Sequence, residues 1–196
     1  STTNNGSYGI GYVIAIQVVF SESVTVTGTP QLTLETGTSD AVVDYVSGSP
    51  GTTLLFNYTV AENHESSDLD YASTSALALN GGTIKDAADN EATLTLATPG
   101  QAGSLGVNRD IVIDGVKPTV SNVTSTTNDG SYGIGDTIAI QVVFSESVTV
   151  AGGTPQLTLE TGTSDGVANY VSGSGSTTLL FDYVVAENHE SSDLDY

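Results

Sequence analysis

An internal duplication constrains this chain more than any other feature of its sequence. The stretch "STTNNGSYGIGYVIAIQVVFSESVTV" at residues 1–26 returns at residues 125–150 as "STTNDGSYGIGDTIAIQVVFSESVTV". After one inserted glycine the match continues to Tyr196, the counterpart of Tyr71, with 11 differences over 71 aligned positions. Solenoid repeats span about 20–50 residues, whereas this period is that of a whole small domain. We therefore expect a string of separately folded domains.

The composition restricts the partners of such domains. The chain carries 23 acidic and 3 basic side chains, a formal charge of −20. Because phosphate binding requires clustered Lys and Arg, we expect no nucleic-acid partner and no attraction to an anionic membrane. No segment approaches the ~20 apolar residues of a membrane helix, so membrane insertion is not expected. Cysteine is absent, which leaves oxygen atoms as the plentiful metal ligands.

Alternation of apolar and polar residues predicts β-strands along the whole chain. The inward faces expected for "TTLLFNYTV" and "DTIAIQVVF" are Leu54, Phe56, Tyr58, Val60 and Ile138, Ile140, Val142, Phe144. Shorter alternating runs occur at "PQLTLET", "AVVDYV", "ATLTLAT" and "DIVIDG", separated by turn clusters such as "TGTSD" and "LNGG". Several short strands at this spacing predict an all-β fold of antiparallel sandwich domains.

The segment "IDGVKPTVSNVTS" marks the expected domain boundary. Asp114-Gly115 forms a turn after one domain, and Pro118 opens the next, since the first position of a strand can lack a donor. The expected domains are residues 1–114, which lack an opening strand, and residues 115–196, which lack closing strands. Such truncation exposes strand edges. Either the sequence is an arbitrarily cut fragment of a longer chain, or a neighbouring chain supplies the missing strand by β-augmentation.

Four motifs taken together, "FSESVTV", "SSDLDY", "GGTIKDAADN" and "IVIDGVKPTV", resemble the tandem Ig-like, cadherin-like repeats of large bacterial surface proteins, the repeats-in-toxin-type adhesins and their relatives. The resemblance covers the whole chain. It implies Ig-like sandwich domains, an extracellular location at the cell surface, and calcium bound between successive repeats. The implied function is structural: a stalk that holds a terminal binding domain away from the cell.

The resemblance also implies a set of calcium ligands. They are Glu22 and Glu146 after the second strand; Asp68 and Asp70, with their copies Asp193 and Asp195, in the D-x-D element; Asp86, Asp89 and Asn90 in "KDAADN"; and Asp114 in the linker. The second copy adds Asp129 and Asp136, where the first has Asn5 and Tyr12, so a site that uses them is weakened in the first copy. Asp89 also stands where these repeats favour glycine, which leaves the geometry of that turn open.

The D-x-D element has a simple physical rationale. Asp68 and Asp70 are two apart on an extended segment and therefore point to the same side, with Leu69 pointing inward. Calcium takes six to eight oxygen ligands, and without a cation two adjacent carboxylates repel each other. The alternative is an acidic loop open to water. Magnesium suits the segment less well because it demands octahedral, water-rich coordination.

Other functions receive less support from the sequence. His64 and His189 stand near serines and aspartates, but these residues crowd into one polar loop, whereas catalytic triads draw on distant segments; we expect no enzyme. The tyrosines that suggest a sugar-stacking platform are Tyr8, Tyr45, Tyr58 and Tyr71. The expected function is a calcium-stiffened stalk repeat whose partners are neighbouring repeats. The alternatives are a filament subunit joined to identical chains by strand exchange, and a carbohydrate-binding module.

Overall fold

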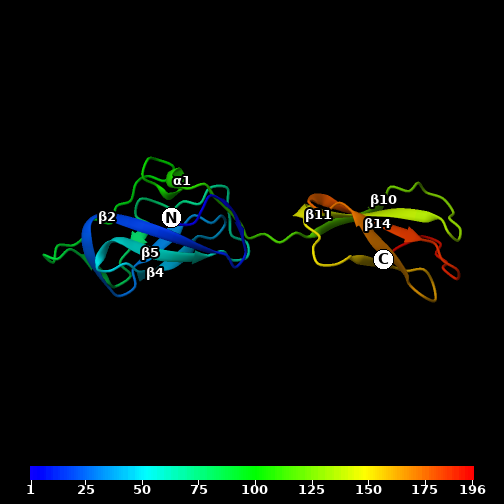
Figure 1. The fold of residues 1–196 in the computed structure, drawn as a ribbon, viewed down its shortest axis with the longest axis horizontal. Coiled ribbons are helices and arrows are strands. Elements are labelled where there is room, and N and C mark those ends of the chain that lie inside the picture. Colours follow the sequence, from blue (N-terminus) through cyan, green and yellow to red (C-terminus); the bar gives the residue numbers. More distant parts are fainter. The chain divides into compact units, whose positions relative to one another are not determined.

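The computed structural model describes residues 1–196, which form two compact units, Ser1–Lys117 (unit 1) and Pro118–Tyr196 (unit 2). Figure 1 draws unit 1 from blue to green and unit 2 from green to red. Each unit has a hydrophobic core of its own. The division falls between Lys117 and Pro118, inside the segment where the sequence places the domain boundary.

Unit 1 consists of short strands and a single helical turn. Its elements are β1 (Gly6–Gly9), β2 (Val13–Thr27), β3 (Gln31–Leu34), β4 (Ala41–Ser47), β5 (Gly51–Thr59), β6 (Glu65–Ser66), β7 (Leu77–Ala78), β8 (Thr83–Lys85), α1 (Leu105–Asn108) and β9 (Ile111–Asp114). One sheet has the order β7-β3-β4-β5-β2-β8, and a smaller one has the order β1-β9-β6. All neighbouring strands are antiparallel except β1 and β9, which run parallel.

Unit 2 contains one five-stranded antiparallel sheet. Its strands are β10 (Val120–Ser125), β11 (Thr137–Val148), β12 (Gln156–Leu159), β13 (Gly166–Ser172) and β14 (Ser176–Val184), in the order β10-β11-β14-β13-β12. The run β11-β14-β13-β12 repeats the run β2-β5-β4-β3 of unit 1. The two copies of the sequence therefore build the same four-stranded framework.

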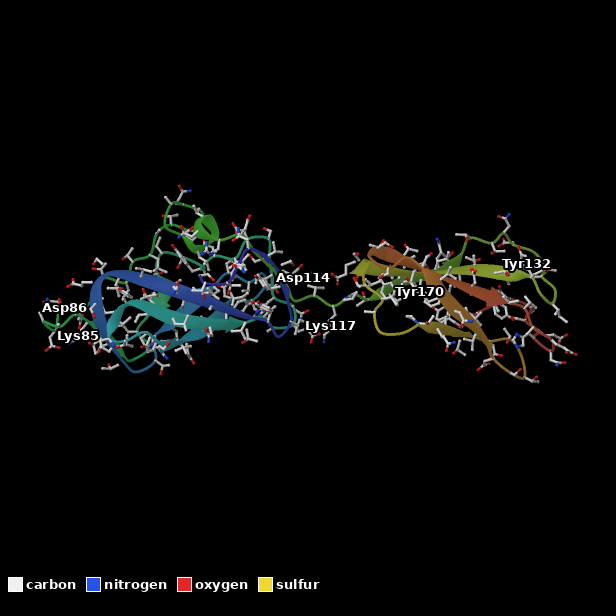
Figure 2. The ribbon with its side chains drawn as sticks, viewed as in Figure 1. Lys85, Asp86, Asp114, Lys117, Tyr132 and Tyr170 are labelled. Atoms are coloured by element: carbon white, nitrogen blue, oxygen red, sulfur yellow. The ribbon has the colours of Figure 1, made fainter.

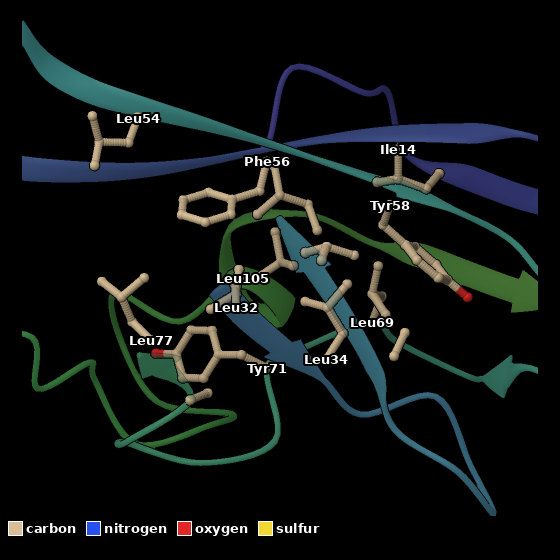
Figure 3. Close-up of a cluster of buried hydrophobic side chains, with 14 of the residues drawn as sticks. Ile14, Leu32, Leu34, Leu54, Phe56, Tyr58, Leu69, Tyr71, Leu77 and Leu105 are labelled. Atoms are coloured by element: carbon tan, nitrogen blue, oxygen red, sulfur yellow. The ribbon is translucent and has the colours of Figure 1, made fainter. Parts of the chain in front are cut away.

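The all-β class predicted from the alternating pattern is confirmed, and so is the phase of the pattern. On β5, Leu54, Phe56 and Tyr58 are buried while Asn57 and Thr59 are exposed. Figure 3 shows Leu54, Phe56 and Tyr58 pointing into the same interior as Leu32 and Leu34 of β3. No helix of the chain is long and apolar enough to cross a membrane.

One predicted strand is wrong. The run "ATLTLAT" at residues 92–98 alternates as a strand does, but it forms no ladder. Ala92, Leu94 and Leu96 still pack against the core of unit 1, so the inward phase is correct. The backbone makes isolated hydrogen bonds instead, from Ala92 N–H to the Ile84 carbonyl and from Leu96 N–H to the Thr74 carbonyl. This segment covers the core as an extended strap.

The same four letters adopt different structures in the two units. "GSYG" forms β1 in unit 1, where it pairs with β9. Its copy at residues 130–133 is not a strand. No strand of unit 2 pairs with residues 130–133. Pairing here depends on a distant segment and not on the local sequence.

Candidate functional site: the acidic loops

The repeated stretch "ENHESSDLDY" is anchored to the core in unit 1. Leu69 is fully buried, as expected from its inward phase, and its N–H donates to the Ile111 carbonyl at 2.7 Å. Tyr71 is also buried, and its hydroxyl donates to the Ala97 carbonyl at 2.6 Å. The second half of this stretch, from Leu69 onward, is therefore packed against the core. It is not an acidic loop open to water.

Asp70 holds a neighbouring loop in place. Its side chain is buried, and its Oδ1 accepts hydrogen bonds from the N–H groups of Tyr71 at 2.9 Å and Leu105 at 3.1 Å. Its Oδ2 accepts a bond from the N–H of Gly100 at 3.0 Å. A buried carboxylate needs such partners because its transfer from water is costly. Asp70 thus fixes the connection that leads into α1.

The carboxylates of Asp68 and Asp70 converge, as expected for residues two apart on an extended segment. A methyl group added at Gly106 would lie 3.1 Å from Oδ2 of Asp68 and 3.2 Å from Oδ2 of Asp70. Burial raises the pKa of Asp68, and the nearby charges of Asp110 and Asp70 raise it further, against a hydrogen bond from the Ile111 N–H. Negative charge is therefore concentrated around Asp68 and Asp70. Helix α1 can pack closely against these two carboxylates only because Gly106 has no side chain.

A second group of predicted ligands lies around the loop after β8. Glu22, Asp86 and Asn90 line one cavity of about 330 Å³ together with Glu91. Oδ1 of Asp86 accepts from the N–H groups of Ala88 and Asn90, both at 2.8 Å, and its Oδ2 accepts from Nδ2 of Asn90 at 2.7 Å. These bonds from Asn90 hold the pKa of Asp86 below its usual value. The carboxylate organises its own loop, as aspartates do in Asx-turns.

The structure shows the geometry of the turn at Asp89, which stands where the similar repeats favour glycine. Asp89 has a φ of 67°, in the left-handed region that glycine favours. Aspartate tolerates this region better than most residues. The glycine-type turn is therefore retained with an aspartate in place, and the Asp89 side chain is exposed.

The structure separates these groups within unit 1. Figure 2 shows Lys85 and Asp86 at one end of the unit and Asp114 and Lys117 at the other. Asp114 is exposed at the end of β9, opposite Glu65 of β6 in the ladder. Asp114 and Asp86 therefore cannot share an ion. Nowhere in the chain are three or more His, Cys, Asp or Glu side chains arranged to hold a metal ion.

In unit 2 the copied acidic residues have fewer partners. Asp193, Asp195 and Asp129 line one hollow of about 690 Å³. The Asp195 carboxylate accepts one hydrogen bond, from the N–H of the adjacent Tyr196 at 2.9 Å.

The two remaining ligands predicted in unit 2 are Asp136, which lies in a turn, and Glu146, which is half-buried. Oδ2 of Asp136 accepts from the Gly133 N–H at 2.7 Å within a turn. At the matching position of unit 1, Tyr12 packs against Tyr8 instead, with ring centroids 4.3 Å apart and ring planes tilted by 37°. Glu146 is half-buried, and its Oε1 has no hydrogen-bond partner.

Each unit also contains a Tyr–His pair that the sequence analysis missed. The Tyr58 hydroxyl and Nδ1 of His64 lie 2.9 Å apart, and the two rings stack. Tyr183 and His189 repeat the pair at 2.8 Å. Burial raises the pKa of Tyr58 to about 12. The sequence does contain a signal for this pair: in both copies, a tyrosine on the inward face of a strand is followed six residues later by a histidine.

Comparison with known proteins adds no relative to this description: no family model matches the chain, and neither a curated protein nor a solved structure is similar to it.

Proposed function

We propose that this chain is a structural segment of a bacterial extracellular surface protein, built from tandem Ig-like β-domains that act as a spacer. The observation that carries the proposal is the framework common to the two units, β2-β5-β4-β3 and β11-β14-β13-β12, each around its own core. A duplicated domain that packs independently extends a chain by a fixed module. Enzymatic function does not require near-identical copies in series.

The roles of the acidic side chains support a structural function. Asp70 and Asp86 direct their oxygens at backbone N–H groups of their own unit and so fix loop conformations. Two of the tyrosines that suggest a sugar-stacking platform in the sequence contribute to packing instead. Tyr58 is buried and Tyr45 packs edge-on against Phe56, with ring centroids 6.2 Å apart. These side chains stabilise the domain.

Calcium is the cofactor that we propose for this spacer. The residues that would hold it in unit 1 are the converging pair Asp68 and Asp70, with the charge of Asp110 nearby, and the group of Glu22, Asp86 and Asn90. Calcium prefers carboxylate, amide and backbone oxygens, and the charge of −20 favours cation binding in general. A bound ion would offset the repulsion between Asp68 and its acidic neighbours.

Thermal unfolding of the full chain in calcium and in chelator tests the metal. Binding to the folded state alone raises stability by RT ln(1 + [Ca²⁺]/Kd), about 2.7 kcal/mol at a hundredfold excess over Kd. Asp68→Asn should reduce this gain, because it removes one carboxylate of the proposed site. The substitution leaves the hydrogen bonds of Asp70 intact. The exposed Asp40 lies outside the proposed ligands, so Asp40→Asn is the matched control. Equal melting temperatures in both buffers would remove calcium from the proposal.

The spacer role has its own test. Arrays with increasing numbers of the repeat should lengthen in proportion to copy number, as measured by small-angle scattering. Compact particles whose maximum dimension does not grow in this way would refute the spacer, whatever the outcome with calcium.

A further inference from the structure

The last residues of unit 1 lie against a turn made by residues 61–64, which we call the exit turn. The N–H of Gly115 donates to the His64 carbonyl at 2.7 Å, and the Gly115 carbonyl accepts from the N–H of Asn63 at 2.9 Å. Gly115 is buried, whereas the three residues after it are exposed. Both backbone polar groups of Gly115 are therefore satisfied by the exit turn.

The space at position 115 admits only glycine. A methyl group added there would collide with the carbonyl oxygen of Ala61 and would lie 2.6 Å from that of His64. The φ angle of Gly115 is not positive, so the requirement comes from space and not from backbone conformation. Glycine here serves the close approach of two backbones.

The contact between Gly115 and the exit turn continues a strand ladder. Asp114, at the end of β9, pairs with Glu65 of β6, and the bond from Gly115 to His64 extends this pairing by one step. The Glu65 N–H also donates to the carbonyl of Thr36 at 3.0 Å, and Thr36 is buried. The chain beside the exit turn is thus fixed to the body of unit 1.

The exit turn has a defined geometry of its own. The His64 N–H donates to the Ala61 carbonyl at 3.3 Å, and Asn63 has a φ of 65°. The ring of His64 stacks on the buried Tyr58 and shares a hydrogen bond with its hydroxyl. The copy at residues 186–189 repeats the turn, the left-handed asparagine and the stacked Tyr–His pair. The shape of the turn is therefore set by its own residues and by the tyrosine beneath it.

An ion pair lies beside the backbone bonds. Nζ of Lys117 donates to Oε2 of Glu62 at 2.7 Å, and this is the one ion pair of the chain. Lys117 lies at the end of unit 1 (Figure 2), so one of the three basic side chains is used at this turn. Both partners are more than half exposed, and an exposed ion pair contributes little to stability. The backbone bonds of Gly115 therefore supply most of the strength of the contact.

The connection beyond the exit turn is short. The first residue of unit 2 with a backbone hydrogen bond is Thr119, whose N–H donates to Oγ of Ser145 at 3.0 Å and whose carbonyl accepts from the Ser145 N–H at 2.8 Å. Three residues separate it from Gly115. The last of them, Pro118, fixes its own φ and restricts the residue before it to extended conformations. One residue, Val116, therefore keeps ordinary backbone freedom.

We propose that the exit turn is a clamp that fixes the direction in which the chain leaves the domain, and that it does so without a metal ion. Two backbone bonds hold Gly115, and the pair of Glu62 and Lys117 holds the segment that follows. The inference rests on the spacer function proposed above and deepens it, because a spacer of constant length requires joints that do not bend freely. It is independent of calcium, since none of the clamp bonds uses a carboxylate of the proposed calcium ligands.

Amide exchange measured by NMR on the full chain in chelator tests the clamp directly. The N–H groups of Gly115 and Asn63 should exchange about tenfold or more slowly than amides of an unstructured chain. Gly115→Ala should remove the protection at Asn63. Gly153→Ala is the matched control, because it adds the same methyl group at a glycine with open space around it. Unchanged protection of Phe56, on β5, shows that the variant domain remains folded.

The joint itself is tested by a distance distribution. The chain has no cysteine, so spin labels can be attached at Val42→Cys and Val167→Cys, two exposed positions that correspond in the two units. Double electron–electron resonance in chelator should give a narrow distribution with the clamp intact and one roughly twice as wide or more with Gly115→Ala, as for a flexible linker. Lys117→Gln should have a smaller effect of the same sign, and Lys85→Gln, which removes an unpaired charge, should have none.

Three results would overturn the clamp. The first is fast exchange at Gly115 and Asn63 in the unaltered chain, and the second is a distance distribution that Gly115→Ala leaves unchanged. The third is a distribution that is narrow in calcium and broad in chelator, because the joint would then depend on metal. Arrays that lengthen in proportion despite a broad joint would reject the clamp and leave the spacer, whereas a narrow joint in arrays that collapse would reject the spacer and leave the clamp.

Discussion

Replacing Asp70 by alanine tests whether this carboxylate acts as a structural acceptor. The substitution leaves the N–H groups of Tyr71, Leu105 and Gly100 without their partner. An unsatisfied buried donor costs about 1–3 kcal/mol. Leu105 and Tyr71 are buried and bear this cost, whereas Gly100 is exposed and can bond to water. We therefore expect the free energy of unfolding of unit 1 to fall by about 2–4 kcal/mol.

The copy in unit 2 is the internal control. Asp195 is exposed and accepts only the N–H of Tyr196, so Asp195→Ala should cost less than about 0.5 kcal/mol. Urea unfolding followed by hydrogen-exchange mass spectrometry separates the units, because the peptides that cover β5 and β14 differ at Asn57 and Asp182.

Calcium distinguishes the two roles considered for Asp70. Because the hydrogen bonds are internal to unit 1, the loss should be present in chelator as well as in calcium. If Asp70→Ala were harmless in chelator, or if both variants lost the same stability, the acceptor role assigned to Asp70 would be refuted.

Three further predictions concern single residues of unit 1. The pKa of Tyr58 is raised by burial to about 12, so its contribution to stability is fully present below pH ~10 and is lost as the pH rises toward 12. In an ultraviolet titration, Tyr58→Phe should lack the phenolate step that occurs at the highest pH. A titration curve unchanged by the substitution would contradict this prediction. Val43→Ala removes two buried methyl groups and should cost about 1.5–2.5 kcal/mol in urea unfolding, against less than ~0.5 kcal/mol for the exposed Val42→Ala. Gly48→Ala should lower the melting temperature more than Gly81→Ala, since both glycines have positive φ but only at Gly48 would the new methyl collide with the Thr53 carbonyl; equal shifts would argue against the collision.

The framework of each unit was predictable from the sequence because it depends on local alternation. Ile14, Leu54 and Phe56 show their inward phase in the letters around them, and burial follows that phase. The strap at residues 92–98 has the same alternation but no partner edge for a ladder. Periodicity identifies the side that is buried, and it does not identify the strand that pairs.

The candidate site was less predictable for a related reason. The letters of "SSDLDY" predict two carboxylates on one side, which agrees with the convergence of Asp68 and Asp70 at Gly106. They do not reveal that the loop at Gly100 and Leu105 returns to bond with Asp70, since those residues lie far along the chain. The role of Asp70 therefore depends on N–H groups 30 and 35 residues away in the sequence.

The parallel pairing of β1 with β9 has a mechanical consequence. These strands are the first and last of unit 1, and their ladder joins Gly6–Gly9 to Ile111–Asp114. When a chain is pulled by its two ends, parallel terminal strands slide past each other, and all the bonds between them are strained at once instead of opening one after another. Single-molecule force measurements on unit 1 should show a sharp rupture peak, which Tyr8→Pro should diminish: the Gly6 N–H donates to the Asp110 carbonyl of the β9 segment, so the Tyr8 N–H, two residues on, faces β9 as well, and proline cannot donate. The β1–β9 ladder therefore places the resistance to a pulling force at the two ends of unit 1, where the chain enters and leaves the domain.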